Sequence, residues 1–233
     1  MKFHKKIPIT IIILLIFILE FPTCISNINN IDHNKPSNSD IVLLTGFGPF
    51  DVYDINPSQL IVEELNGQNV EGAEIIGLIL PVDFSTSVEN ITSAIDTYKP
   101  NIVISTGLSP SAKKINVEKI GVNIKMHHRS EKLWFIPRRL EKFGPFFRFS
   151  NLETEEIVSN MREAEIPSRQ SYYAGFYICN AVLYGVLGYI IEKQLPISAG
   201  FIHLPLLTSQ DPEGMEFQTM IEGIKIVIRT SLE

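Results

Sequence analysis

The sequence predicts an α/β domain with a mainly parallel, or mixed, central sheet and helices on both faces. Short continuous apolar runs, typical of buried parallel strands, alternate along the chain with segments whose apolar residues recur at helical spacing. The 233 residues are 45% hydrophobic and 20% charged, a globular balance that supports one sizeable core. The pattern contains no internal repeat and no sign of a second domain.

The first half of the domain is expected to contain three strands and two helices. The strands cover residues 41–45, 73–80 and 101–106, and the first and third end at Gly46 and Gly107. Asn56 is a suitable N-cap with proline at the next position, which predicts a helix to about residue 65. A second helix over residues 85–98 places three apolar side chains on one face: Val88, Ile91 and Ile95.

The second half is expected to contain two strands and three helices. A weakly alternating stretch predicts one strand over residues 117–126, and residues 127–145 are the least regular part of the chain. Helices are predicted over residues 152–164, 179–192 and 214–231, with a strand over residues 197–203 that ends at His203. Ligand sites gather at the carboxyl ends of parallel strands, where Gly46, Gly107 and His203 all fall.

The first 40 residues differ in composition from the rest. Three lysines, Lys2, Lys5 and Lys6, precede an apolar run over residues 7–19. This is typical of a signal peptide, and it is shorter than the about 20 residues that span a bilayer. We expect a signal peptide or N-terminal membrane anchor over residues 1–24, a flexible polar spacer over 25–40 and the folded domain over 41–233. The protein is then exported or membrane-anchored, or cytoplasmic if the leader does not function.

Charge and cysteine content exclude several classes of function. The net charge is −6, without the basic footprint of a nucleic-acid-binding protein. Two cysteines, Cys24 and Cys179, provide neither a disulfide framework nor a thiolate zinc site. Cys24, at the end of the leader, allows lipidation as an alternative to simple cleavage. If Cys24 instead stays in the mature protein, we expect a disulfide with Cys179 to silence that thiol.

Cys179 is the most informative residue because it is the only cysteine outside the leader. In residues 175–180 a strand-like approach turns into a helical pattern, so the thiol lies at a helix N-terminus, where the thiolate is favoured. His203 lies at a strand end in residues 200–205. Together they indicate a cysteine nucleophile and its base. The alternatives are a small buried core cysteine and a hydrogen-bonded core histidine.

Four motifs resemble one known family. Thr45-Gly46-Phe47-Gly48-Pro49-Phe50 followed by Asn56-Pro57, the run Ile115-Asn116-Val117-Glu118-Lys119-Ile120-Gly121-Val122-Asn123, and the cysteine and histidine fragments occur in the order found in pyroglutamyl peptidase I, the pyrrolidone-carboxylate peptidases. The resemblance runs from about residue 41 to the C-terminus. It implies a three-layer α/β/α sandwich, and a cysteine peptidase that needs no metal or cofactor. It also implies a peptide substrate with N-terminal pyroglutamate, and a homo-oligomer.

The resemblance also implies a role for individual residues. Cys179 matches the nucleophile, His203 the base and Glu118 the third member of a Cys-His-Glu triad, in which the carboxylate orients the imidazole. Without the resemblance, Glu118 would be interpreted as an exposed strand residue. Sequence spacing does not show that these three side chains meet.

The same resemblance implies a substrate pocket. Phe47 and Phe50 match aromatic residues that line the pyroglutamyl pocket, Tyr177 occupies a position that is often aromatic, and Asn56 matches a residue that supports the loop. A neutral lactam suits such an apolar slot with a few backbone hydrogen bonds. Ordinary core packing for the aromatic residues, and a helix cap for Asn56, are compatible alternatives. Backbone N–H groups near Cys179 and after Gly46 are expected to form an oxyanion hole.

The sequence departs from the family pattern at four places. Asp51 and Val52 replace two glycines, residues 109–113 replace a Gly-Arg-Ser stretch, and residues 133–139 replace an Asp-Asn-rich loop. The family's arginine falls on His128, and Arg129, one position later, is the candidate to replace it. These departures leave two alternatives: a related thiol amidase with altered specificity, and a non-catalytic exported binder of peptide N-termini.

Overall fold

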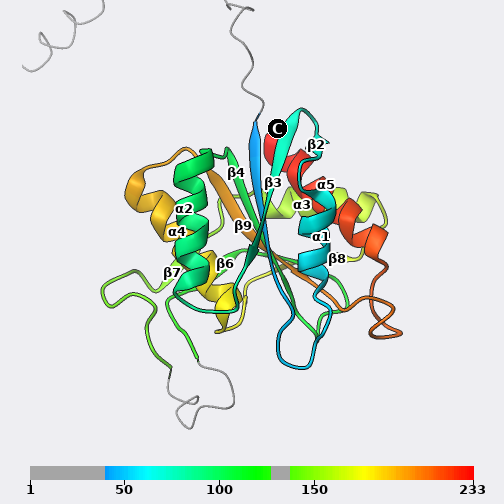
Figure 1. The fold of residues 1–233 in the computed structure, drawn as a ribbon, viewed down its shortest axis with the longest axis horizontal. Helices are drawn as coiled ribbons and strands as arrows, with labels where there is room; N and C mark the ends of the chain where they lie inside the picture. Colours follow the sequence, from blue (N-terminus) through cyan, green and yellow to red (C-terminus); the bar gives the residue numbers. More distant parts are fainter. Residues whose placement is uncertain (1–39, 127–136) are drawn as a thin grey trace, which may run out of the picture. The chain divides into compact units, whose positions relative to one another are not determined.

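The structure, a computed structural model, describes residues 40–126 and 137–233. The predicted leader, Cys24, His128 and Arg129 lie outside these residues, as does nearly all of the predicted spacer. The described residues form a seven-stranded sheet, five helices and a separate two-stranded sheet (Figure 1). The helices are α1 (Pro57–Leu65), α2 (Thr86–Tyr98), α3 (Thr154–Glu163), α4 (Ile178–Lys193) and α5 (Phe217–Leu232).

The large sheet is mixed, with a parallel centre. Its strand order is β2-β3-β1-β4-β9-β5-β8, and β3, β1, β4 and β9 run parallel to one another. β2 pairs antiparallel with β3 at one edge, and β5 pairs antiparallel with β9. The strands are β1 (Ile41–Phe47), β2 (Asn69–Val70), β3 (Ala73–Leu80), β4 (Ile102–Leu108), β5 (Ile115–Glu118), β8 (Ser168–Ser171) and β9 (Ser198–Leu204).

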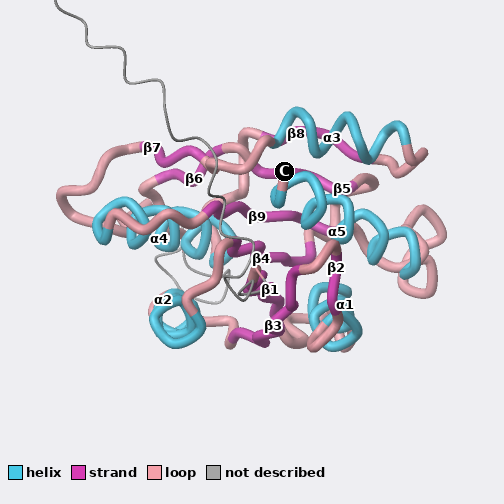
Figure 2. Tube along the Cα trace, turned by 90° about the horizontal axis from the view of Figure 1, so that it is seen from above, coloured by secondary structure: helices cyan, strands magenta, loops and turns pink. Residues whose placement is uncertain are grey.

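Helices cover both faces of this sheet, which confirms the predicted three-layer α/β/α architecture (Figures 1 and 2). One hydrophobic cluster packs α1, α3 and α5 against the sheet, and a second packs α2 and α4 against its other face. Successive strand residues point to opposite faces. In β1, Val42 and Leu44 therefore belong to the first cluster and Leu43 to the second.

α4, the helix that carries Cys179, has apolar residues on nearly all sides, and other elements of the fold pack against nearly all of them. It contacts α2, the central sheet and the small sheet formed by β6 (Ile120–Val122) and β7 (Phe147–Phe149). Tyr184 is fully buried, and its hydroxyl donates to the Pro145 carbonyl at 2.8 Å. A helix that is hydrophobic all round is expected to be buried, so the sequence of α4 agrees with its place in the fold.

The predicted single strand over residues 117–126 is wrong. β5 ends at Glu118, Lys119 interrupts the pairing, and β6 joins β7 in the separate sheet. The Lys119 amide donates to the Ser171 carbonyl at 2.7 Å, and the Lys119 carbonyl accepts from the Ser150 amide at 2.9 Å. The chain therefore changes sheets at Lys119, immediately after Glu118. The apolar residues change phase at this break, from odd positions (Ile115, Val117) to even ones (Ile120, Val122), so the alternation does not run through one strand.

The other predicted elements are confirmed within a few residues at each end. The strand-like approach to Cys179 is wrong, because β8 ends at Ser171 and residues 172–177 are a loop in which Gly175 has a φ of +80°. β2, β7 and β8 were not predicted, since each is two to four residues long. Within the described ranges, every helix is too short or too polar to cross a lipid bilayer.

Candidate active site

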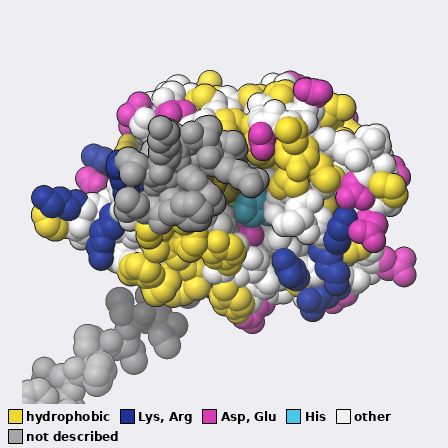
Figure 3. All heavy atoms as spheres, turned by 90° about the horizontal axis from the view of Figure 1, so that it is seen from below, with side chains coloured by type: hydrophobic (Ala, Val, Ile, Leu, Met, Phe, Trp, Pro, Cys, Tyr) yellow, Lys and Arg dark blue, Asp and Glu magenta, His cyan; other side chains and the backbone are white. Residues whose placement is uncertain are grey.

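Three side chains predicted to act together line one cavity of about 410 Å³. Cys179 is the second residue of α4, His203 is the penultimate residue of β9, and Glu118 is the last residue of β5. All three face the layer formed by α2 and α4. His203, the one histidine of the described ranges, is visible in a hollow of the surface in Figure 3.

His203 and Glu118 form a direct hydrogen bond. The Nδ1–H of His203 donates to Oε1 of Glu118 at 2.8 Å, which directs Nε2 away from the carboxylate. Antiparallel pairing of β5 with β9 produces this contact, because it places Glu118 opposite Phe201 and Asn116 opposite His203. Glu118 is 1% exposed and His203 is 7% exposed, so the pair is shielded from water.

The environment of His203 favours its protonated form. Burial lowers the pKa of His203, but the negative charge of the Cys179 sulfur, the hydrogen bond with that sulfur, and the carboxylate of Glu118 raise it to about 10. The imidazole is therefore held in its protonated form at neutral pH. Among residues 40–126 and 137–233, the buried Oε2 of Glu118 has no hydrogen-bond partner, so the carboxylate bonds the imidazole through Oε1 alone.

Gly107, in β4, makes room for the Cys179 sulfur. A Cβ atom at this position would lie 2.9 Å from Cζ of Phe201 and 3.1 Å from Sγ of Cys179. Both distances are shorter than ordinary van der Waals contact. Gly107 therefore permits the nucleophile to lie close to the end of β4, a requirement that the sequence indicated only through the position of this glycine at a strand end.

The N-terminus of α4 is positioned by the residue after the nucleophile. Asn180 is fully buried; its Oδ1 accepts from the Val122 amide at 2.8 Å, and its Nδ2 donates to the carbonyls of Val122 and Ile124 at 2.9 and 2.8 Å. These bonds join α4 to the chain that follows Glu118. Asn180 was missed as a site residue, since an asparagine in the first turn of a helix resembles an ordinary polar residue.

The backbone at this helix terminus is suited to stabilise an anion. Tyr177 is the N-cap residue, is extended at φ −99° and ψ −160°, and makes no side-chain capping bond. The first amides of a helix have no partner within the helix, and they carry partial positive charge. The Cys179 sulfur thus lies beside amide groups that an oxyanion can use.

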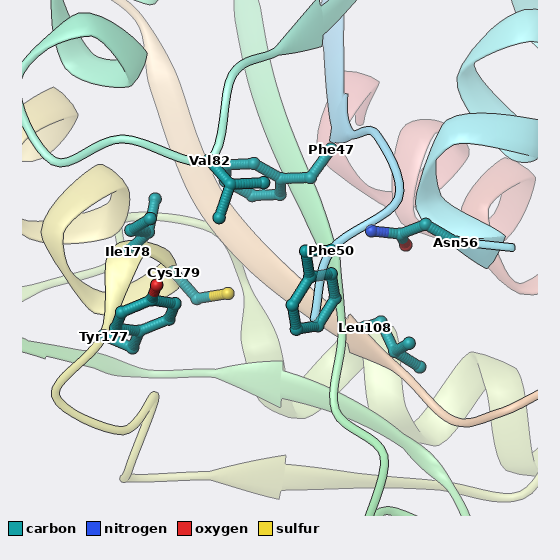
Figure 4. A pocket seen from close by; sticks show the side chains of 8 residues that line it. All are labelled: Phe47, Phe50, Asn56, Val82, Leu108, Tyr177, Ile178 and Cys179. Carbon is teal, nitrogen blue, oxygen red and sulfur yellow. The ribbon is translucent and has the colours of Figure 1, made fainter. Parts of the chain in front are cut away.

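An apolar pocket opens beside the sulfur (Figure 4). Of the predicted substrate-binding residues, Phe47, Phe50, Asn56 and Tyr177 all line it, together with Val82, Leu108, Ile178 and Cys179. Figure 4 shows the sulfur pointing from α4 toward the ring of Phe50. The free space is about 30 Å³, and the half-buried rings of Phe50 and Tyr177 form part of its wall.

Asn56 performs two structural tasks at this pocket. Its Oδ1 caps α1 by accepting from the Ser58 amide at 3.1 Å, and its Nδ2 donates to the Gly48 carbonyl at 2.9 Å. Ser58 extends the network, because its Oγ accepts from the Phe47 amide at 3.0 Å. The predicted cap and the predicted loop contact are therefore both present in one side chain.

Phe84 is a second residue that sequence analysis missed. Its ring meets the ring of Tyr177 edge-on, with centroids 5.5 Å apart and an interplanar angle of 87°. Lys125 lies over the same Phe84 ring, with its Nζ 5.6 Å from the centroid. Phe84 thus packs behind one wall of the pocket. The sequence could not predict this contact, because it joins two segments that lie far apart in the chain: the connection before α2 and the loop before α4.

The comparison with known sequences decides the family. The sequence model described as pyroglutamyl peptidase matches residues 40–233. The chain belongs to the pyroglutamyl peptidase family. It is therefore a cysteine peptidase, and Cys179 is its only cysteine in the matched part.

Individual members of the pyroglutamyl peptidase family are similar over most of their length. A pyrrolidone-carboxylate peptidase of Halalkalibacterium halodurans is 36% identical over 168 residues, covering 71% of this chain and 84% of the relative. One from Coprothermobacter proteolyticus is 29% identical over 202 residues, covering 82% and 97%. The solved structure of pyrrolidone carboxyl peptidase from Thermococcus litoralis has a TM-score of 0.78 at 29% identity, covering 83% of this chain and 93% of that one.

The roles of the predicted site residues stay predictions. Arg129 lies outside the described residues, and so does His128, on which the family arginine falls. Within residues 40–126 and 137–233, no cluster of three histidine, cysteine or acidic side chains could hold a metal ion.

Proposed function

We propose that this protein is a thiol exopeptidase that hydrolyses the bond after an N-terminal pyroglutamyl residue. The observation that carries the proposal is the arrangement at one cavity: Cys179, His203 and Glu118 line it, His203 bonds Glu118 at 2.8 Å, and an apolar pocket adjoins the sulfur. The pyrrolidone-carboxylate peptidases among its relatives support the same substrate class.

The proposed reaction proceeds through a thioester. The Cys179 thiolate attacks the carbonyl carbon of the pyroglutamyl residue, and the resulting tetrahedral intermediate carries the charge on oxygen. Protonated His203 gives a proton to the leaving amine as the C–N bond breaks. His203 then takes a proton from a water molecule that attacks the thioester, which releases pyroglutamate and restores the thiolate–imidazolium pair. Glu118 keeps the imidazole oriented and stabilises its positive form throughout.

Backbone amides are the proposed source of oxyanion stabilisation. The amides of the first turn of α4, which includes Cys179, lie beside the sulfur and have no partner within the helix. Amides of the loop after Gly46 complete the site in this proposal. Loss of one donor of this kind typically costs about 10²-fold to 10³-fold in kcat.

The pocket chemistry supports a neutral lactam as the bound group. Phe47, Val82 and Ile178 are apolar walls, and none of the described residues that line this pocket has a charged side chain. A free α-ammonium group would lose its hydration there without a counter-ion, at a cost of several kcal/mol. A pyroglutamyl ring carries no such charge, so an ordinary peptide N-terminus is discriminated against.

The proposal is tested with a pyroglutamyl-coumarin amide under reducing conditions. The wild-type protein is expected to release the fluorophore, and Cys179→Ala to lower kcat/KM by about 10⁴-fold or more, since no nucleophile remains. Cys179→Ser, which keeps a hydroxyl of similar size, serves as the matched variant and is also expected to be nearly inactive. Equal turnover by wild type and Cys179→Ala would reject the proposed nucleophile.

A related thiol amidase with altered specificity is the second candidate. The favouring observation is the pocket rim, where Val52 is 78% exposed and Asp51 adopts a left-handed φ of 52° that a glycine would adopt without strain. A panel of pyroglutamyl, acetyl-aminoacyl and free aminoacyl amides separates the two candidates. Preference for pyroglutamyl amides rejects the second, whereas tight binding without turnover supports a non-catalytic binder.

A further inference from the structure

The catalytic cavity continues along the sheet toward Arg169 in β8. Ser111, Asn116 and Arg169 line this cavity, and the same three residues line a neighbouring cavity of about 240 Å³ that also includes Lys113 and Lys114. The two cavities are neighbours that share these three residues, and together they are called the groove here. None of the three residues lines the apolar pocket, so the groove is available to the leaving part of a peptide.

Strand pairing places Arg169 on a line with the catalytic histidine. Arg169 is opposite Asn116 in the β5–β8 pair, and Asn116 is opposite His203 in the β5–β9 pair. Adjacent strands are about 4.8 Å apart, so the backbones at Arg169 and His203 are separated by about 10 Å. An extended peptide rises about 3.3 Å per residue, so this stretch of groove accommodates two or three residues of a leaving peptide.

The guanidinium of Arg169 is oriented by one hydrogen bond and has its remaining donors available. Its Nε donates to Oδ1 of Asn116 at 2.8 Å, and Asn116 is only 5% exposed, so the anchor is rigid. Within the described parts of the chain, the two terminal nitrogens of Arg169 make no hydrogen bond and no ion pair. Two parallel N–H donors on one edge of a guanidinium match the two oxygens of a carboxylate.

The charges around the groove favour an anion at this position. Lys113 is neutralised by Asp211 and Glu213, with N···O distances of 3.0 and 3.1 Å. Lys114 is exposed at the far cavity and adds a second positive charge on the same side as Arg169. The acid nearest the catalytic centre, Glu118, is already bonded to the imidazole.

We propose that Arg169 is a specificity-determining residue that binds a carboxylate on the leaving peptide, two or three residues beyond the scissile bond. The inference rests on the proposed peptidase function and names its preferred substrate class. That class is either short pyroglutamyl peptides with a free C-terminus or longer ones with an acidic side chain at this distance. Both sources present the same chemical group to the guanidinium.

Three substrates distinguish the sources of the carboxylate. They are pyroglutamyl-Ala-Ala with a free carboxylate, the same peptide as its C-terminal amide, and pyroglutamyl-Ala-Glu as its C-terminal amide. Wild type is expected to hydrolyse the free acid with a kcat/KM about tenfold above that of the Ala-Ala amide, since a bidentate pair is charge-assisted. A similar gain for the Ala-Glu amide identifies an acidic side chain as a second source.

Arg169→Gln tests the residue directly. This variant is expected to lose the preference for carboxylate substrates and to leave kcat/KM for the Ala-Ala amide unchanged within about twofold, because the amide makes no charged contact. Arg169→Lys keeps the positive charge but lacks the two parallel N–H donors, so it is expected to retain part of the preference. Arg162→Gln, an exposed arginine in the last turn of α3, is the matched control and should behave as wild type.

The outcomes separate the inference from the function on which it rests. If wild type hydrolyses acid and amide equally well, or if Arg169→Gln lowers kcat/KM for all three substrates alike, the carboxylate site is rejected while the peptidase function stands. Thermal melting of each variant identifies a loss caused by unfolding. If wild type hydrolyses none of the pyroglutamyl substrates, the proposed function is rejected and the inference with it.

Discussion

At the scale of single residues, the proposed chemistry depends on one buried imidazole with two partners. The pKa of His203 reflects a balance, because burial lowers it while the Cys179 sulfur and the Glu118 carboxylate raise it to about 10. Glu118 is fully enclosed and its Oε1 accepts from His203. Removing that carboxylate therefore changes the charge state of the ring as well as its orientation.

Glu118→Gln is expected to change how stability depends on pH. A histidine whose pKa is raised from 6.5 to about 10 stabilises the fold fully below pH 6.5, and this contribution is lost as the pH rises through about 10. Without the carboxylate charge the pKa of His203 falls, so the loss begins at lower pH. Thermal unfolding measured from pH 6 to 10 should show the midpoint of Glu118→Gln declining earlier than that of wild type. Parallel curves for the two proteins would contradict this.

Gly107→Ala is expected to misplace the nucleophile. The added Cβ would lie 3.1 Å from the Cys179 sulfur and 2.9 Å from the Phe201 ring, so the sulfur must shift. Displacement of a reacting atom by about 1 Å can cost 10²-fold in rate, and we expect kcat to fall by about that amount. Gly72→Ala is the control, because it strains a residue at φ +88° with open space around it. It should lower the melting temperature without lowering kcat.

At the scale of elements, the site is built where α4, β9 and β5 end or begin together. α4 supplies Cys179 and is tied by Asn180 to Val122 and Ile124, in the chain that leaves Glu118. α1 is tied to the pocket loop by Asn56. Side-chain amides that bond backbone groups thus join α4 to the chain after β5, and α1 to the pocket loop.

Asn56→Asp separates the two tasks of this residue. The aspartate still caps α1 by accepting from the Ser58 amide, but it cannot donate to the Gly48 carbonyl. We expect the free energy of unfolding to fall by about 1–3 kcal/mol even though the cap persists, because this position is 1% exposed and the new carboxylate faces the Gly48 carbonyl without a donor between them. The loss of loop order is expected to raise KM for a pyroglutamyl-coumarin amide several-fold. Asn56→Ala removes both bonds and should also lower stability; an unchanged KM in both variants would reject the loop contact.

At the scale of the whole molecule, the family match and both hydrophobic clusters lie within residues 40–233. The leader, its cleavage and export or membrane anchoring stay predictions, as do the cytoplasmic alternative and a homo-oligomer. Cys24 and Cys179 are the only cysteines of the chain. Whether Cys24 stays in the mature protein therefore decides if a disulfide with Cys179 can form, which mass spectrometry of the mature N-terminus determines.

Deletion of residues 1–38 is expected to leave a folded and active enzyme. The deletion removes no residue of the sheet, the helices or the proposed active site. The melting temperature and kcat/KM for a pyroglutamyl amide should therefore match those of the full chain within experimental error, under reducing conditions. Loss of folding in the shortened protein would show that the first residues contribute to the core, contrary to the predicted domain boundary.

The sequence alone predicted the layered α/β architecture, most element positions and the family. Three local signals predicted their elements correctly: the continuous apolar run of β1, the capping residue Asn56 before α1, and the many apolar residues of α4. Local signals failed at Lys119, where the chain changes sheets, and in β2, β7 and β8, which are too short to show a period. Pairing between distant segments, which decides such strands, leaves little trace in local pattern.

By itself the sequence determined the chemical types at the site: one thiol after the leader, a histidine at a strand end and a glutamate in a family motif. The tertiary structure decided how they meet, because register between β5 and β9 brings Glu118 to His203, and Gly107 admits the sulfur. It also placed Arg169 in line with the histidine across two strand spacings. The sequence states which residue types are present. Cys179 and Glu118 are 24 and 85 positions from His203, so packing and hydrogen bonding alone decide how close these side chains come.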